Sequence, residues 1–532
     1  MKKTGNSDPR LSVMKLVMTA FCCALTVKLA LNAASPEYKE AALSQGSCTV
    51  KLPVSYGTIY DRNGTPLVNR SSEYIAVVRG DSESAEAVLP YVVDKDEFYE
   101  KISSGMPFTC EVNTDSIESD SVHVFEVPIR YDEEQMAQHI IGYTHDGEGV
   151  CGLESDYDYI LRQDNGRTSV TFEVDGTGGA LSGENSIVRY APSPSQGVVT
   201  TIDAGIQLIC EEAAESLEKG GIVVMDVKTG DILAMVSVPS YSLSNMEEAV
   251  SSEDSPLINR ALYSYPVGSI FKLVTSAAAI ESGDENFTHD CTGTVEIGTQ
   301  VFGCHNREGH GMETLETALI NSCNPYFIAM SQLLSPLELF ETAANFGFGR
   351  ETELSAGITS SAGYLPTVSE LMLPAERGNF CFGQGKLTAT PVQITRMTCA
   401  IANYGMLPEV RLIKGVTEDG EMPDESEAVS GEQVLSTETA EKLRLMMIGA
   451  VYGSSGFNGR PTGISAGAKT STAQTGRFDE NGVEYCHGWI TGFFPANIPE
   501  YAVTVLAEDG GYGNEAAAPV FKEIAEGISE SF

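Results

Sequence analysis

A serine and a lysine three residues apart open an apolar segment in the middle of the chain. They are Ser269 and Lys272, and the apolar segment continues to residue 280. On a helix, positions i and i+3 lie on one face, so the lysine amine can reach the serine hydroxyl. Serine is a weak nucleophile that needs a base, and burial lowers the pKa of a lysine until its neutral amine can accept the proton. The pair therefore predicts a serine nucleophile with a lysine base, although Ser-x-x-Lys alone is common by chance.

Two further polar motifs come later in the chain. Residues 322–324 read Ser-Cys-Asn and lie 53 residues after Ser269, on a loop between two apolar runs. The serine and the asparagine, two apart on that loop, can both face one cleft. Residues 469–472 read Lys-Thr-Ser-Thr, lie 147 residues after Ser322, and fall on a predicted strand. Alternate side chains of a strand share a face, so the lysine and serine point one way and the two threonines the other. Three such motifs in this order are far more specific than any one of them.

Two cysteines flank a short segment with hairpin character. They are Cys291 and Cys304, and both a disulfide between them and free thiols are open alternatives. A zinc site that adds His305 and His310 is a third alternative, but the spacing matches no standard ligand pattern. We therefore predict no bound metal and no cofactor.

The first residues predict a membrane segment. An apolar stretch from residue 16 to 27 is interrupted by Lys28 and resumes to residue 34. A tight span over residues 11–34 is feasible because lysines at its ends can snorkel to the interface, and a cleaved signal peptide is the alternative. Basic residues before the stretch place residues 1–10 in the cytoplasm and the rest of the chain outside.

Length, charge and composition limit the class of protein. The 532 residues suggest two to four domains. The formal net charge of −41 excludes a general nucleic-acid binder, because phosphate contacts require basic patches. Hydrophobic residues make up 42% of the chain, which is enough to build large cores.

The pattern of apolar residues changes near residue 200. Residues 35–200 contain recurrent strand-like runs between Gly, Asp and Asn, and we expect an extended β-rich region there. Beyond it we expect a helix capped by Asp203, strands at 221–226 and 230–237, and strands again at 465–473, 486–494 and 501–507. The helices expected between these strands cover residues 270–282, 314–332, 335–346, 391–404 and 437–452. Helices enclosed between two sets of antiparallel strands predict an α+β domain over residues 201–532.

Together, the three polar motifs resemble those of class B penicillin-binding proteins, the D,D-transpeptidases of peptidoglycan synthesis. The resemblance covers nearly the whole exported chain and includes matches at residues 57–64, 149–154, 201–203, 229–234 and 383–385. It implies an N-terminal membrane helix, a pedestal or dimerisation-type domain over residues 35–200, and a penicillin-binding serine-transferase domain. That last domain would be an antiparallel sheet with helices on both sides.

The resemblance implies a role for each polar residue of the first two motifs and for Lys469. Ser269 would attack a D-Ala-D-Ala stem peptide and form an acyl-enzyme, with Lys272 as general base. Ser322 would relay a proton to the leaving amine, and Asn324 would hydrogen-bond the peptide. Lys469 would set the electrostatic field around that relay.

The resemblance also assigns the binding groups. Thr470 and Thr472 would engage the terminal carboxylate, and the backbone N–H groups of Ser269 and Thr472 would form the oxyanion hole. The family usually has glycine where this chain has Ser471. A side chain there is expected to narrow the cleft or weaken acylation by β-lactams.

The implied function is cross-linking of peptidoglycan stem peptides, with penicillin binding at the same serine. A D,D-carboxypeptidase or a β-lactam hydrolase would use the same site, and a non-catalytic cell-wall scaffold is a further alternative. The implied partners are stem peptides, β-lactams and a membrane glycosyltransferase, with no nucleic acid. The implied location is the cell membrane, with a single span and an extracytoplasmic catalytic domain.

Overall fold

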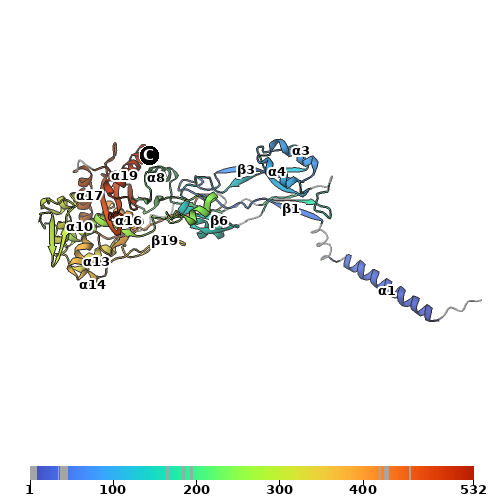
Figure 1. Ribbon diagram of the computed structural model, residues 1–532, viewed down its shortest axis with the longest axis horizontal. Helices are drawn as coiled ribbons and strands as arrows, with labels where there is room; N and C mark the ends of the chain where they lie inside the picture. The colour runs from blue at the N-terminus through green and yellow to red at the C-terminus, as the bar shows by residue number, and fades with distance from the viewer. Residues whose placement is uncertain are drawn as a thin grey trace, which may run out of the picture. The chain divides into compact units, whose positions relative to one another are not determined.

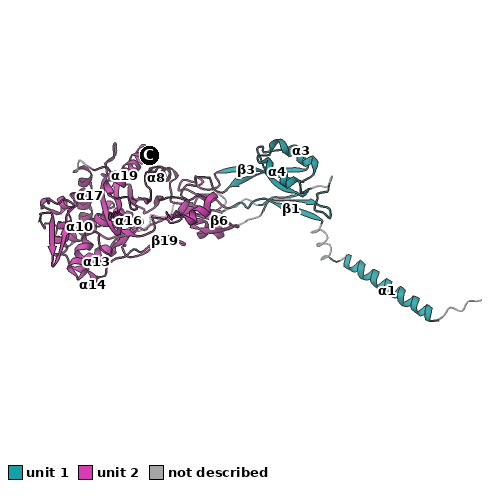
Figure 2. Ribbon diagram, viewed as in Figure 1, with its two compact units in different colours: residues 1–55, 71–129, 164–193 teal, residues 56–70, 130–163, 194–532 magenta. Residues whose placement is uncertain are grey.

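A computed structural model describes most of the chain. The described residues are 9–33, 35, 46–162, 167–181, 186–191, 196–418, 421–423, 431–453 and 457–531. Residues 1–8 of the expected cytoplasmic tail lie outside them. The chain forms two compact units, shown in Figure 2, and the second unit takes up two segments from within the first. Unit 1 comprises Met1–Ser55, Ser71–Ile129 and Asp164–Ser193, and unit 2 comprises Tyr56–Arg70, Arg130–Gln163 and Pro194–Phe532.

Unit 1 contains the N-terminal helix and two small antiparallel sheets. Helix α1 (Pro9–Ala33) has 25 residues, is exposed throughout, and is long and apolar enough to cross a membrane. One sheet has the order β4-β3-β5 and is covered by two helices, and the other has the order β1-β8-β9. These elements are β1 (Ser47–Lys51), β3 (Ser71–Val78), α3 (Ser82–Val88), α4 (Lys95–Ile102), β4 (Phe108–Val112), β5 (Val122–Ile129), β8 (Ser169–Glu173) and β9 (Ile187–Arg189).

Unit 2 is built on a five-stranded antiparallel sheet of order β12-β11-β26-β25-β24. Its strands are β11 (Gly220–Asp226), β12 (Ile232–Val238), β24 (Gly467–Phe478), β25 (Glu484–Phe494) and β26 (Tyr501–Ala507). The strands are mostly buried on both faces because helices cover each face. This arrangement confirms the predicted α+β class and the predicted strands.

One face of this sheet is covered by α8 (Ala204–Ala214) and α19 (Ala518–Ser531), which lie side by side (Figure 1). Asp203 caps α8 as expected, since its carboxylate accepts the backbone N–H groups of Gly205 and Ile206. The other face is covered by α16 (Pro391–Ala402), which contacts β11, β25 and β26.

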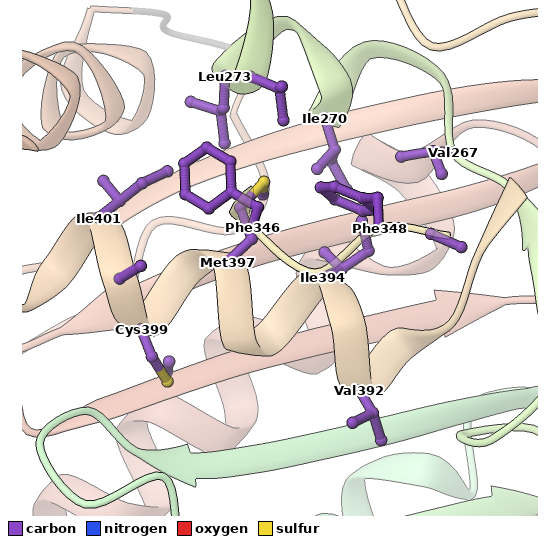
Figure 3. Packing of buried hydrophobic residues seen from close by; sticks show 14 of the residues in the cluster. Val267, Ile270, Leu273, Phe346, Phe348, Val392, Ile394, Met397, Cys399 and Ile401 are labelled. Carbon is purple, nitrogen blue, oxygen red and sulfur yellow. The ribbon is translucent and has the colours of Figure 1, made fainter. Parts of the chain in front are cut away.

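Helix α16 packs between the sheet and α10 (Lys272–Glu281), the helix that begins just after Ser269 (Figure 3). Val392 and Cys399 point from α16 toward the strands, and the opposite side of α16 packs toward α10. The apolar layer between the two helices contains Val267, Ile270, Leu273, Phe346, Phe348, Ile394, Met397 and Ile401. The core therefore fixes the segment around Ser269 relative to the sheet.

Other helices of unit 2 pack against α10 or, in the case of α14, against its neighbours α13 and α15. They are α11 (Leu315–Ile320), α12 (Asn324–Met330), α13 (Pro336–Asn345), α14 (Val368–Leu371), α15 (Pro374–Cys381) and α17 (Thr437–Tyr452). A continuous helix over 314–332 is not formed: the chain makes α11 and α12 with a break at Ser322, where the sequence predicts a loop. Ser322 has φ 52, in the left-handed region, which a continuing α-helix cannot contain.

The segments that enter unit 2 from earlier in the chain are held by a buried ion pair. They form β2 (Ile59–Tyr60), α5 (Gln138–Ile141), β6 (Tyr143–His145), β7 (Glu148–Cys151), α6 (Gly152–Asp156) and α7 (Asp158–Leu161). Arg130 donates from Nε and Nη2 to the two carboxylate oxygens of Glu154, each at 2.8 Å, and from Nη1 to the Gly57 carbonyl at 2.7 Å. The pair thus connects two of the segments, 57–64 and 149–154, that carry the family resemblance.

Replacing Glu154 with alanine leaves Arg130 buried without its charged partner. We expect the free energy of unfolding to fall by about 3–5 kcal/mol, the typical cost of breaking a buried pair. Urea unfolding can be followed by the fluorescence of Trp489, which is the sole tryptophan and is buried in the sheet of unit 2. The control is Glu148→Ala, because Glu148 is exposed and its pair with Arg162 is worth less than about 1 kcal/mol. An equal loss in the two variants would contradict the prediction.

Candidate active site

Ser269 lies in a tight turn in front of α10. The turn is the 3-10 helix η3 (Gly268–Phe271), and Gly268 has φ +65. A side chain at Gly268 would collide with Ser471 and Ala473 of β24, so this position requires glycine for both its conformation and its packing. The Gly268 N–H donates to the Gly383 carbonyl at 2.8 Å. Ser269 is partly exposed, and among the described residues its hydroxyl makes no hydrogen bond.

Lys272 is fully buried and directs its amine toward residues 322–324. Nζ donates to the Ser322 carbonyl at 2.7 Å, to the Ser322 hydroxyl at 3.1 Å and to Asn324 Oδ1 at 2.7 Å. Burial, reinforced by the positive charge of Lys469, holds the pKa of Lys272 well below its ordinary value. The expected contact between Lys272 and the Ser269 hydroxyl is not among its hydrogen bonds. Contacts to a nucleophile are often long in unliganded enzymes and shorten when substrate binds.

The left-handed conformation at Ser322 directs its hydroxyl toward both lysines. α11 ends before it, and the Cys323 N–H donates back to the Ala318 carbonyl at 2.9 Å. α12 then begins at Asn324, with Pro325 in its first turn, where the missing N–H costs nothing. The loop thereby presents a hydroxyl, a carbonyl and an amide oxygen as acceptors on one side.

Lys469 approaches the same hydroxyl from the sheet. Its Nζ donates to Ser322 Oγ at 3.2 Å and to the Thr470 carbonyl at 3.0 Å. Burial lowers the pKa of Lys469 to about 8. The structure thus brings Lys272, Ser322, Asn324 and Lys469 into one hydrogen-bonded group next to the turn of Ser269.

The two threonines of β24 differ in their contacts. Thr470 is partly exposed, and among the described residues its hydroxyl makes no hydrogen bond. The Thr472 hydroxyl accepts the N–H of Gly513 at 3.2 Å, at the start of α18 (Gly513–Ala516). β24 is the edge strand of the sheet, so alternate backbone N–H groups face away from β25, as an oxyanion donor requires. The assignment of that donor to Thr472 stays a prediction.

Ser471 does not project into open space. Its side chain is 3% exposed, and its hydroxyl donates to the Val267 carbonyl at 2.7 Å. It therefore contacts the segment that precedes Ser269.

A second cluster adjoins the Ser322 loop. Cys291, Cys304, His310 and Cys323 each offer one atom, and these atoms all lie within 4.8 Å of one another. Cys304 Sγ lies 3.5 Å from His310 Nδ1, and Cys291 Sγ lies 3.7 Å from it. Three sulfurs and one imidazole nitrogen form a donor set that suits tetrahedral zinc.

The cluster bears on the alternatives left by the sequence. Cys291 and Cys304 form no disulfide in the structure. The fourth member is Cys323 rather than His305, whose Nδ1 lies 3.9 Å from Cys304 Sγ but outside the group. Proximity of the two sulfurs lowers the pKa of the Cys304 thiol and raises the pKa of the Cys323 thiol. Sequence reasoning missed Cys323 because it stands alone in the chain, and only its place between Ser322 and Asn324 pointed to the site.

Comparison with known proteins gives relatives over most of the length of this chain. Stage V sporulation protein D of Bacillus subtilis is 29% identical over 91% of this chain and 80% of that protein. The peptidoglycan D,D-transpeptidase MrdA of Acinetobacter baumannii is 25% identical over 88% of this chain and 80% of that protein. Among solved structures, a ceftriaxone acyl-enzyme complex of penicillin-binding protein A from M. tuberculosis has a TM-score of 0.65. It is 21% identical and covers 91% of this chain and 99% of its own.

The model of the penicillin-binding protein transpeptidase domain matches residues 220–526. This match includes the sheet from β11 to β26, the turn of Ser269, the Ser322 loop and β24. More than half of the chain is covered, and the chain therefore belongs to the penicillin-binding protein transpeptidase family.

Proposed function

We propose that this chain is a serine D,D-transpeptidase that cross-links peptidoglycan stem peptides and is acylated by β-lactams. The observation that carries the proposal is the buried Lys272 amine, bonded to Ser322 and Asn324 and placed one helical turn from Ser269. A lowered pKa makes the Lys272 amine easier to deprotonate, and the neutral amine can act as a general base. The names of the relatives, such as peptidoglycan D,D-transpeptidase MrdA, support the same reaction.

The reaction can be written with these groups. Ser269 Oγ attacks the carbonyl carbon of the penultimate D-Ala, and its proton passes to the Lys272 amine. When the tetrahedral intermediate collapses, the C–N bond breaks and the terminal D-Ala leaves with a proton delivered through the Ser322 hydroxyl. The amine of a second stem peptide then attacks the ester, forms the new amide and releases Ser269.

The remaining groups bind and orient the stem peptide. The Asn324 amide hydrogen-bonds the peptide, and Lys469 holds a positive charge beside Ser322. The Thr470 and Thr472 hydroxyls receive the terminal carboxylate. The backbone N–H groups of Ser269 and Thr472 stabilise the negative oxygen of the intermediate, a contribution of about 2.7–4 kcal/mol per donor.

The alternative functions differ in the fate of the acyl-enzyme. A D,D-carboxypeptidase or a β-lactam hydrolase would admit water in place of the acceptor amine at the same site. A non-catalytic scaffold would have no reason to retain two buried lysines, since an ammonium group without a function is costly to bury.

The apolar helix α1 supports a membrane-anchored chain with a single span. With basic residues before it, the catalytic domain lies outside the cytoplasm. The domain order is then a tail over 1–10, an anchor over 11–34, a pedestal over 35–200 and a transpeptidase domain over 201–532. The partner that supplies glycan strands is a membrane glycosyltransferase.

The cluster of three cysteines and one histidine supports a zinc ion in place of the metal-free site expected from the sequence. Cys291, Cys304, His310 and Cys323 would hold it with all four positions filled by protein, which is typical of structural zinc. Because Cys323 joins Ser322 to Asn324, the ion would fix the loop that carries both. No step of the reaction passes through it.

The nucleophile is tested with a fluorescent penicillin and the detergent-solubilised full chain. We expect a covalent band that Ser269→Ala abolishes. Ser276→Ala is the matched control, because Ser276 lies on α10, seven residues after Ser269, and among the described residues its buried hydroxyl has no hydrogen-bond partner. An acyl-D-Ala thioester with an added amine then separates transfer from hydrolysis by its products. No band and no thioester turnover would leave the scaffold as the function.

The pKa of Lys469 near 8 predicts an alkaline limit on acylation. Below pH 8 the ammonium group is charged and supports the relay through Ser322. Above it the charge is lost, and the acylation rate should fall by up to about tenfold per pH unit. Lys469→Arg keeps the charge because arginine stays protonated, so the fall should move to higher pH. Stopped-flow acylation across pH 6–10 measures this, and an alkaline limb that stays in place in Lys469→Arg would contradict the assignment.

The zinc site is tested by metal content and thermal stability. We expect about one zinc per chain by mass spectrometry of the dialysed protein, and near zero in Cys323→Ser. A chelator should lower the melting temperature of the unaltered chain and leave that of Cys323→Ser unchanged. Cys210→Ser is the control, since Cys210 is a buried thiol of α8 outside the cluster and its loss should leave the zinc content intact. A chain that takes up no zinc from a zinc-saturated buffer would refute the site.

A further inference from the structure

Two residues paired across the edge of the sheet both bond to the segment in front of the nucleophile. Ser471 of β24 and Trp489 of β25 are register partners. The Ser471 hydroxyl donates to the Val267 carbonyl at 2.7 Å, and Trp489 Nε1 donates to the Pro266 carbonyl at 3.0 Å. The side chains of Ser471 and Trp489 are 3% and 0% exposed. The neighbouring strands β24 and β25 thus each donate a hydrogen bond to one of two consecutive carbonyls, those of Val267 and Pro266.

The Ser471 bond spans the two halves of the proposed oxyanion hole. Val267 lies two residues before Ser269, and Ser471 lies directly before Thr472. The two backbone N–H groups assigned to the oxyanion therefore belong to segments that this one hydrogen bond joins. Gly268 packs against Ser471 and Ala473 so closely that no side chain fits there. The hydrogen bond from Ser471 to Val267 therefore joins the turn directly to the strand.

We propose that Ser471 is a positioning residue that sets the separation of the two oxyanion donors. This inference rests on the proposed function, because it assumes that Ser269 is acylated. The family usually has glycine at this position, and from that alone a side chain here is expected to weaken acylation. The positioning role predicts the opposite effect on the acylation rate. The hydroxyl here is turned into the protein and bonded, so removing it should slow the reaction.

The test measures acylation by penicillin in the full chain. Ser471→Ala and Ser471→Gly both remove the hydroxyl, and we expect the first-order acylation step to slow about tenfold or more, because small misplacements of catalytic groups are costly. The Kd of the complex that precedes acylation should change less than about twofold. Ser471→Thr keeps a hydroxyl and should recover most of the rate. Ser276→Ala again controls for the loss of a buried serine hydroxyl.

Hydrogen–deuterium exchange supplies a readout that does not depend on activity. The peptide covering residues 265–273 should exchange faster in Ser471→Ala than in the unaltered chain, while the Trp489 fluorescence melt shows that the sheet is folded. Acylation of Ser471→Ala at the unaltered rate, or faster acylation of Ser471→Gly, would overturn the proposal. If the unaltered chain forms no acyl-enzyme, the proposed function fails. Unchanged exchange in Ser471→Ala would then overturn the positioning role separately.

Discussion

Two lysine amines buried beside one serine hydroxyl are the constraint on which the rest of the site depends. Lys272 comes from α10, Lys469 comes from β24, and both donate to Ser322 Oγ. Burying an ammonium group costs several kcal/mol unless acceptors are already in place. The carbonyls of Ser322 and Thr470 and the amide oxygen of Asn324 supply those acceptors. Burial then has a chemical consequence, because it lowers both pKa values toward neutrality, where one lysine can act as a base.

This constraint explains the unusual loop between α11 and α12. A straight helix through this region would not turn the Ser322 carbonyl, the Ser322 hydroxyl and the Asn324 amide to the same side. The left-handed backbone at Ser322 does so, at a cost of order 1–3 kcal/mol that neighbouring structure must offset. A capping box formed by Thr314 and Thr317 fixes the start of α11, and Cys323, buried in the core, anchors the loop. The cluster around Cys323 lies where the strained backbone most needs support.

The sequence carries some of these features and not others. The strands of the sheet could be predicted because long β-branched and apolar runs end at turns such as that after Asp226, and Asp203 marks the start of α8. The loop at residues 322–324 could be predicted from its place between two apolar runs, but its left-handed backbone could not, since serine has no left-handed signature. The residues of the candidate site could be singled out because three polar motifs occur in one chain in this order. Their contacts could not, because the direction of the Lys272 amine depends on acceptors 50 residues away. Cys323 joined the cluster for the same reason, since its partners are brought to it by the fold.

The hydrogen bonds between the sheet and the helical core differ in whether protonation changes affect them. Lys469 bonds to Ser322 through an ammonium group, so this tie changes whenever either lysine gains or loses a proton. The bonds from Ser471 and Trp489 to the segment of Val267 involve a neutral hydroxyl, a neutral indole and backbone carbonyls, none of which titrates in this pH range. β24 is an edge strand and has a sheet partner on one side only, so its distance from the nucleophile needs a fixed contact. The uncharged hydrogen bonds supply that contact. In the proposed mechanism, they would hold the groups assigned to the oxyanion in place while protons move between Ser269, Lys272 and Ser322.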